Sequence, residues 1–156
     1  MDLYVVFEGI LAKTRSGKRV PENILDMEVN LEAFEWIFRM APENIIILSN
    51  QTWIYSSPGI GNSEKFWAKL RYVSEALREF LESRKVVSKV YSIYSKRKAW
   101  TYGFQSTDPS LIDQIWIEHP ELQGRESVFL GRPIEFDLSY ARQMGFKNIQ
   151  TWNQSI

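Results

Sequence analysis

Five short apolar runs alternate along the chain with four longer segments of helical periodicity. The apolar runs, which we predict to be strands, lie at residues 3–7, 44–49, 88–95, 127–131 and 147–152. The expected helices lie at residues 30–40, 62–85, 108–119 and 134–145. Strands that alternate with helices favour a parallel sheet covered on both faces. The pattern therefore predicts an α/β fold of three layers, α/β/α and Rossmann-like, with a five-stranded parallel sheet.

The chain has the size of one domain. Its 156 residues are enough to bury a sizeable core. Internal repeats, low-complexity tracts and linkers are not evident, so we expect a single domain over residues 1–156 without a large cap domain. The run at 88–95 is less apolar than the one at 44–49, which favours a place near the edge of the sheet.

Composition excludes some classes of partner and chemistry. Nineteen basic residues balance nineteen acidic ones, so the net charge attracts no particular partner. The chain has no cysteine, which rules out disulfides, thiolate metal sites and thiol nucleophiles and is typical of a reducing compartment. Neither a run of transmembrane length nor a signal-peptide pattern is present. We expect a cytoplasmic protein without a membrane partner.

The loops that leave the expected strands carry basic and polar side chains. Ligands of open parallel sheets bind beyond the carboxyl ends of the strands, and four loops should meet at that edge. Between Arg84 and Lys98 the chain has six basic side chains and no acidic one. Ser49 and Asn50 follow an aliphatic strand, where a hydroxyl and free backbone N–H groups can donate to a phosphate. Each feature alone also suits a solvated loop or a turn, but together they favour an anion site.

Four motifs, in order, resemble the haloacid dehalogenase (HAD) superfamily. "VVFEGILA" at 5–12 resembles the strand followed by D-x-D-G-T-L, and "IIILSNQTWI" at 45–54 resembles the strand that ends in S/T-N-Q. "KRK" at 96–98 falls where the family keeps a lysine, and "VFLGRPIEFDLSYARQMGFKNI" at 128–149 resembles the last motif. Within the family, the chain is similar to small uncapped phosphatases, such as the phosphatase domain of polynucleotide kinase–phosphatase and histidinol-phosphate phosphatase.

The resemblance assigns roles to positions where this chain has different residues. In the family, a first aspartate attacks phosphorus and a second acts as acid and base, while carboxylates hold Mg²⁺. Here Val6 stands at the nucleophile position and Glu8 at the acid/base position. Arg132 replaces the first acid of the last motif, and Asp137 with nearby Glu135 matches the vestigial metal position. The resemblance thus implies that catalysis and the ancestral Mg²⁺ are lost, so that no cofactor or metal is expected.

The anion-binding half of such a site is retained. Its candidate residues are Ser49, Asn50, Lys96, Lys98 and Arg132. A guanidinium can hold a phosphate through two parallel hydrogen bonds, so Arg132 can stand in for the missing cation. The favoured function is a pseudo-phosphatase that binds a phosphorylated ligand, a nucleotide or a nucleic-acid end without hydrolysing it.

Aromatic residues near the same loops widen the choice of ligand. Trp53, Tyr55 and Trp100 can stack on bases while cations hold the backbone, or they can pack down as a lid. The sequence leaves two other functions open. One is a protein-interaction or structural module on the same scaffold, with Trp67 and Tyr72 at an interface. The other is a residual HAD-type hydrolase in which Glu8 and Asp137 act on water.

Overall fold

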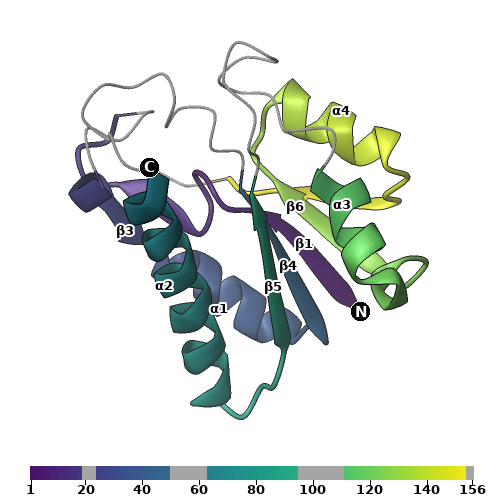
Figure 1. Ribbon diagram of the computed structural model, residues 1–156, viewed down its shortest axis with the longest axis horizontal. Coiled ribbons are helices and arrows are strands. Elements are labelled where there is room, and N and C mark those ends of the chain that lie inside the picture. Colours follow the sequence, from purple (N-terminus) through teal and green to yellow (C-terminus); the bar gives the residue numbers. More distant parts are fainter. Residues whose placement is uncertain (19–23, 50–62, 95–110, 154–156) are drawn as a thin grey trace.

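The computed structural model describes residues 1–18, 24–49, 63–94 and 111–153, which form a five-stranded parallel sheet with helices on both faces (Figure 1). The strands run in the order β5-β4-β1-β6-β7, and every neighbouring pair is parallel. Their bounds are β1 Asp2–Val6, β4 Asn44–Ser49, β5 Lys89–Tyr94, β6 Ser127–Gly131 and β7 Asn148–Thr151. The predicted parallel sheet is confirmed, and β5 lies at its edge as expected.

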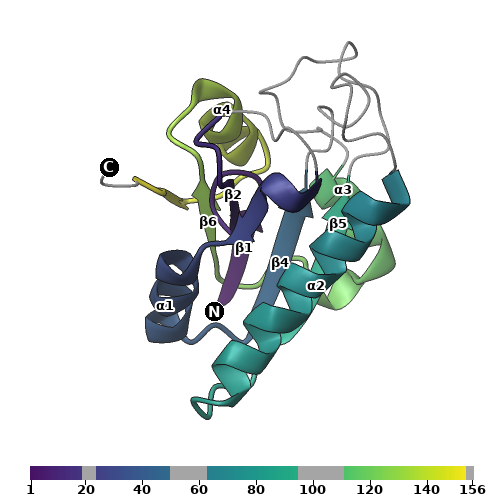
Figure 2. The ribbon, with the colours of Figure 1, turned by 90° about the vertical axis from the view of Figure 1, so that its left-hand side faces the viewer.

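Two helices cover each face of the sheet. Helices α1 and α2 lie on one face and helices α3 and α4 on the other (Figures 1 and 2). Their bounds are α1 Leu31–Met40, α2 Ser63–Glu82, α3 Leu111–Glu118 and α4 Glu135–Gln143. The three-layer architecture is therefore confirmed, and the described residues form no separate cap domain. None of the helices in this part of the chain has the length and apolar character needed to span a membrane.

Strand β1 is the centre of the core. All five of its residues are buried, because β4 and β6 flank it and helices cover both of its faces. In register, Val5 pairs with Ile47 on one side and Leu130 on the other, so aliphatic side chains pack across three strands. A strand buried on both faces needs a continuous apolar run, and "LYVV" supplies it.

A small antiparallel hairpin follows β1 and was not predicted. It pairs β2, Ala12–Thr14, with β3, Met27–Val29, and a short 3₁₀ helix, Ile24–Asp26, precedes β3. The backbone N–H and hydroxyl of Ser16 donate to the buried carboxylate of Asp26, at 2.8 and 2.7 Å. This anchors the chain between the two short strands. Strands of three residues are too short for a recognisable alternation of apolar and polar residues.

Tyr4 links the central strand to α3. Its ring is buried, and its hydroxyl oxygen accepts a hydrogen bond of 2.8 Å from the indole Nε1 of Trp116. The two rings pack edge to face, and their centroids lie 6.4 Å apart. Burial raises the pKa of the Tyr4 hydroxyl above its ordinary value of 10.0, and the Trp116 hydrogen bond only partly offsets this.

We predict that Tyr4→Phe destabilises the protein by roughly 1–3 kcal/mol at neutral pH, because the partly buried indole of Trp116 loses its acceptor. The unfolded chain releases the Tyr4 proton at a lower pH than the folded one, since the pKa is raised on folding. The wild type therefore loses stability as the pH rises above the ordinary tyrosine pKa, and its advantage over Tyr4→Phe shrinks. Urea unfolding of both proteins from neutral to strongly alkaline pH measures this difference.

Tyr72→Phe is the matched control, because Tyr72 is exposed and makes no hydrogen bond through its hydroxyl among the described residues. The free energy of unfolding of Tyr72→Phe should stay within about 0.5 kcal/mol of the wild-type value at each pH. A gap between the wild type and Tyr4→Phe that stays constant into alkaline pH would contradict the role given to the Tyr4 hydroxyl.

Candidate functional site at the carboxyl edge of the sheet

The carboxyl ends of the central strands bring four of the predicted site residues together. Strands β1, β4 and β6 end side by side, because Val6 pairs with Leu48 and Val5 pairs with Leu130. Glu8, Ser49 and Arg132 therefore share this edge, and Asp137 joins them through its ion pair with Arg132. Six other predicted residues lie outside the described part of the chain: Asn50, Trp53, Tyr55, Lys96, Lys98 and Trp100.

Val6 is the last residue of β1 and has an apolar side chain. Its side chain is only 1% exposed and belongs to the main hydrophobic core. The chain then turns sharply: the backbone N–H groups of Leu11 and Ala12 both donate to the carbonyl of Phe7. The position where the HAD resemblance implies an attacking carboxylate thus has neither a nucleophilic atom nor a metal ligand.

Glu8 and Ser49 meet across the ends of β1 and β4. The hydroxyl of Ser49, which is fully buried, donates to Oε1 of Glu8 at 2.7 Å. The hydroxyl has a single proton to donate, and this proton faces a carboxylate. A phosphate oxygen can take the same donor only in place of the Glu8 oxygen.

Arg132 and Asp137 form a side-on ion pair after β6. Nε and Nη2 of Arg132 donate to Oδ2 and Oδ1 of Asp137, both at 2.9 Å, and the Arg132 backbone N–H donates to Oδ2 at 2.8 Å. The side chain of Asp137 is fully buried, and that of Arg132 is 18% exposed. The two parallel hydrogen bonds that we expected Arg132 to offer a phosphate are made to Asp137 instead.

The electrostatic surroundings keep Arg132 charged. Burial by itself lowers the pKa of the guanidinium, but the hydrogen bonds and charge of Asp137, together with the charge of Glu8, outweigh burial and raise the pKa. The stem of Arg132 also passes close to Gly9, where an added Cβ would lie 3.5 Å from the Arg132 Cδ. Gly9 has φ of +76°, a conformation that glycine adopts without strain.

Gly131 makes room for the ion pair at the end of β6. A Cβ at this position would lie 2.8 Å from the Phe129 ring and 3.1 Å from the Cβ of Asp137. Contacts that short force neighbouring groups to move. The glycine before Arg132 therefore lets the first turn of α4 bring Asp137 against the strand end.

Glu135 does not join Asp137. Its carboxylate is exposed and accepts a hydrogen bond of 2.6 Å from Arg142 on the same helix. Within the described ranges, no group of three or more His, Cys, Asp or Glu side chains could hold a metal ion. The donor set of the HAD metal site does not fit a divalent cation here, because a guanidinium stands where one of its carboxylates would be.

The basic residues counted along the sequence do not all gather at this edge. Arg84 and Lys85 follow α2, and Lys89 begins β5, where it pairs in register with Asn44 at the amino end of the sheet. Only the segment after Tyr94 leaves β5 at the carboxyl end. The expectation of six clustered cations is therefore wrong for these three, because the length of β5 separates them from the site.

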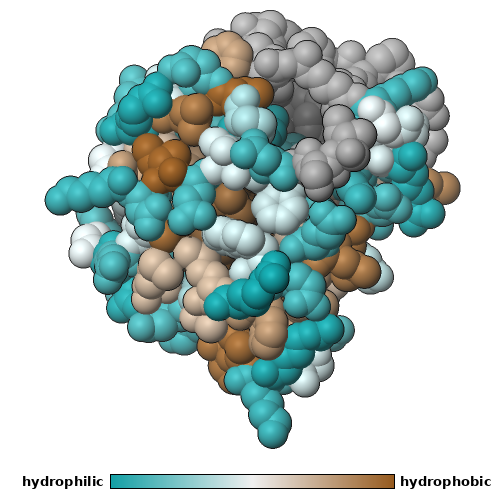
Figure 3. Space-filling view, turned by 180° about the vertical axis from the view of Figure 1, so that it is seen from behind, coloured by the Kyte–Doolittle hydropathy of each residue, from teal (hydrophilic) through white to brown (hydrophobic). Residues whose placement is uncertain are grey.

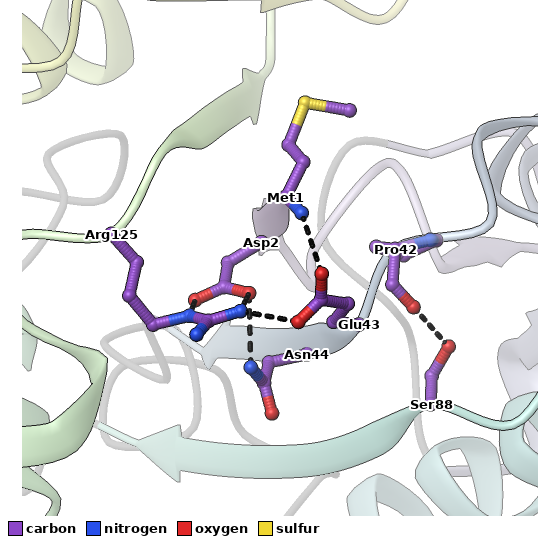
Figure 4. Close-up of polar contacts among 7 residues, drawn as sticks. All are labelled: Met1, Asp2, Pro42, Glu43, Asn44, Ser88 and Arg125. Carbon is purple, nitrogen blue, oxygen red and sulfur yellow. Dashed lines mark hydrogen bonds and ion pairs between the residues drawn. The ribbon is translucent and has the colours of Figure 1, made fainter.

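A second polar cluster, which the sequence reasoning missed, lies at the amino end of the sheet (Figure 4). The fully buried carboxylate of Asp2 accepts hydrogen bonds from Arg125 Nε at 2.8 Å and Asn44 Nδ2 at 2.9 Å. Arg125 also donates to Glu43, whose pKa is lowered by this hydrogen bond. A groove of about 400 Å³ lies beside this cluster, lined by Asn44, Lys89, Tyr91 and Arg125 among others. The one sign of this polar cluster in the sequence was an aspartate at the start of an apolar strand.

No protein-family model matches the chain, and no curated protein matches it. The resemblance to HAD phosphatases therefore rests on the four motifs and their order along the chain.

We predict that the Arg132–Asp137 pair behaves as a strongly coupled unit. Arg132→Met and Asp137→Leu should each cost roughly 3–5 kcal/mol, because each leaves a buried charge without its partner. The double variant should cost much less than the two single costs together, since apolar side chains then replace both charges. Urea unfolding of the four proteins gives the coupling energy.

The control cycle uses Arg142 and Glu135, which pair at 2.6 Å on the surface of the same helix. Their side chains are 56% and 76% exposed, so solvent screening should keep their coupling below about 1 kcal/mol. Equal coupling in the two cycles would show that burial does not strengthen the Arg132–Asp137 pair.

Proposed function

We propose that this protein is a pseudo-phosphatase of the HAD type, which binds a phosphorylated ligand at the carboxyl edge of its sheet without hydrolysing it. The observation that carries the proposal is the replacement of the attacking carboxylate by the buried side chain of Val6. The ion pair of Arg132 and Asp137, at the other side of the same edge, supports it.

The loss of hydrolysis follows from what these side chains can do. A covalent route needs a carboxylate oxygen within reach of phosphorus, and a valine has only C–H bonds there. Phosphoryl transfer also needs charge stabilisation at the leaving and attacking oxygens. Arg132 is a cation at this edge, but Asp137 balances its charge and accepts hydrogen bonds from its Nε and Nη2.

Three observations support an anionic phosphate ligand. Open parallel sheets bind ligands at the carboxyl edge. The chain leaves β5 at this edge and continues into Lys96, Arg97 and Lys98, three consecutive basic residues. The four motifs that resemble HAD phosphatases occur in the family's order. We infer that the basic segment supplies most of the attraction for the phosphate, while Arg132 adds a fixed positive charge.

The part of the surface formed by the described residues gives little support to the alternative of a protein-interaction module. Large apolar side chains are exposed singly on different elements, among them Tyr72 on α2, Ile117 on α3 and Phe136 on α4. Seen from the side opposite to Figure 1, hydrophobic residues lie in small groups with hydrophilic residues between the groups (Figure 3). Scattered apolar residues of this kind are normal on soluble proteins. Trp67 is half-buried and packs against the core.

The first test is hydrolysis. With 4-nitrophenyl phosphate and Mg²⁺, the wild type should release phosphate no faster than the uncatalysed reaction. Val6→Asp alone should remain inactive, because Arg132 still stands at the metal position. Phosphate release by the wild type that is abolished by Glu8→Ala or Asp137→Ala would show retained catalysis and contradict the proposal.

The second test is binding. A fluorescent tetrathymidylate with a 3′-phosphate should bind equally well with Mg²⁺ and with a chelator, and more weakly at high salt. Lys96→Ala and Lys98→Ala should each weaken binding by about tenfold, as expected for loss of a charged hydrogen bond. Lys89→Ala is the matched control, because it removes the same charge from the opposite end of β5. An equal loss in all three variants would show non-specific attraction rather than a site.

A further inference from the structure

The groove at the amino end of the sheet has the size of a small-molecule site. Asn44 and Lys89 pair in register at the starts of β4 and β5, and Tyr91 follows Lys89 on the same face of β5. Leu122, shortly after α3, and Arg125, shortly before β6, also line the groove. Its volume of about 400 Å³ lies within the range of ligand pockets.

The two carboxylates of the adjoining polar cluster both have cationic partners. The buried Asp2 accepts hydrogen bonds from Nε and Nη2 of Arg125, and Glu43 accepts one from Nη2 at 2.5 Å. Glu43 also pairs with the amino group of Met1 at 3.5 Å (Figure 4). The guanidinium of Arg125 is therefore held in a fixed position at the edge of the groove.

The same cluster leaves one donor and one acceptor open. Nη2 of Arg125 and Nδ2 of Asn44 both donate to Oδ1 of Asp2, so the two side chains meet. Nη1 of Arg125 and Oδ1 of Asn44 make no hydrogen bond among the described residues. Because both groups are already immobilised, a ligand that binds them pays little for ordering them.

The other charges that line the groove are one lysine and one glutamate. The ammonium group of Lys89 has neither an ion pair nor a hydrogen bond within the described part of the chain. Glu121 lies 3.5 Å from Nδ1 of His119, which is an ion pair only when the imidazole is protonated. One open charge of each sign favours a ligand that carries both signs and no net charge.

Tyr91 gives the groove an aromatic surface. Its half-buried ring packs against the imidazole of His119, and the two centroids lie 4.7 Å apart. Val87, which also lines the groove, is largely exposed, and Leu122 is buried. Apolar groups beside open polar ones suit a ligand that has an apolar part as well as its charges.

We propose that this groove binds a free α-amino acid with an apolar or aromatic side chain. The carboxylate accepts hydrogen bonds from Lys89 and from Nη1 of Arg125. The ammonium group donates to Oδ1 of Asn44 and to Glu121, and the side chain packs on Tyr91. An α-amino acid carries both charged groups on one carbon, which matches a donor and an acceptor that lie side by side. This site goes beyond the proposed phosphate site, since it lies at the opposite end of the strands.

An NMR titration of the isotopically labelled full chain with L-phenylalanine at neutral pH tests the proposal. The backbone amides of Lys89, Leu122 and Arg125 report on the groove, and those of Val6 and Leu130 report on the carboxyl edge. We expect shifts at the groove only, with a Kd of roughly 1 mM. Phenylalaninamide lacks the carboxylate and hydrocinnamate lacks the ammonium group, so each should bind about tenfold more weakly.

Charge-removing variants identify the residues that hold the ligand. Lys89→Gln and Glu121→Gln should each weaken binding of phenylalanine by about tenfold, because each removes one charged partner. Lys147→Gln is the matched control for the lysine, since Lys147 is exposed and directly precedes β7, the other edge strand. Glu118→Gln, at the exposed end of α3, is the control for the glutamate. Both controls should bind like the wild type, and thermal unfolding verifies that all variants are folded.

Three results would overturn the proposal. The first is a titration in which the amides of the groove do not shift. The second is an analogue that binds as tightly as phenylalanine, which would show that one of the two charged groups is not recognised. The third is an equal loss of affinity in Lys89→Gln and Lys147→Gln. None of these results bears on the phosphate site, which is tested separately with the phosphorylated oligonucleotide.

Discussion

The site depends on the ion pair between Arg132 and Asp137. A guanidinium placed at the end of a buried strand needs a counterion, because a charge taken out of water without a partner is very costly. Asp137 provides it from the first turn of α4, with both oxygens engaged side-on and none of its side chain exposed. Arg132 is therefore held in one orientation at the end of β6 and, unlike a bound metal ion, it cannot dissociate.

A similar pair of an arginine and a buried aspartate lies at the other end of β6. Arg125, shortly before the strand, holds the buried Asp2 of β1 through Nε and Nη2, at 2.8 and 3.3 Å. Arg132, directly after the strand, holds Asp137 in the same manner. Both pairs tie β6 to its neighbours, so an arginine on a buried aspartate is in the first instance a structural feature. What distinguishes the carboxyl edge is the additional carboxylate of Glu8, whose field reaches Arg132.

The strands and helices could be predicted because their signals are local and long. Apolar runs such as 44–49 match the observed strands almost to the residue, and the weaker run at 88–95 marked the edge correctly. The hairpin of β2 and β3 escaped prediction because each of its strands has three residues. Its position depends on the side chain of Asp26, whose partner Ser16 lies ten residues away.

The site was harder to predict than the fold, because a sequence shows residue types and not partners. Arg132 was recognised as a cation at the correct edge, but its hydrogen bonds to Asp137 depend on the turn between β6 and α4. Counting basic residues along the chain was misleading for a related reason. Lys89 and Lys96 are close in sequence, but a strand of six residues separates the start of β5 from its end by roughly 20 Å.

A guanidinium at the position where the HAD resemblance implies a metal ion changes what the proposed site can recognise. A divalent cation offers two positive charges and open coordination positions, which oxygen ligands of any charge can fill. Arg132 offers one positive charge, and its Nε and Nη2 already donate hydrogen bonds to Asp137. Glu8 accepts a hydrogen bond from the hydroxyl of Ser49, and its charge helps to raise the pKa of Arg132. In the proposed pseudo-phosphatase, Val6 at the nucleophile position and Arg132 at the metal position act together: the first lacks an attacking oxygen, and the second supplies one positive charge where a metal ion would supply two.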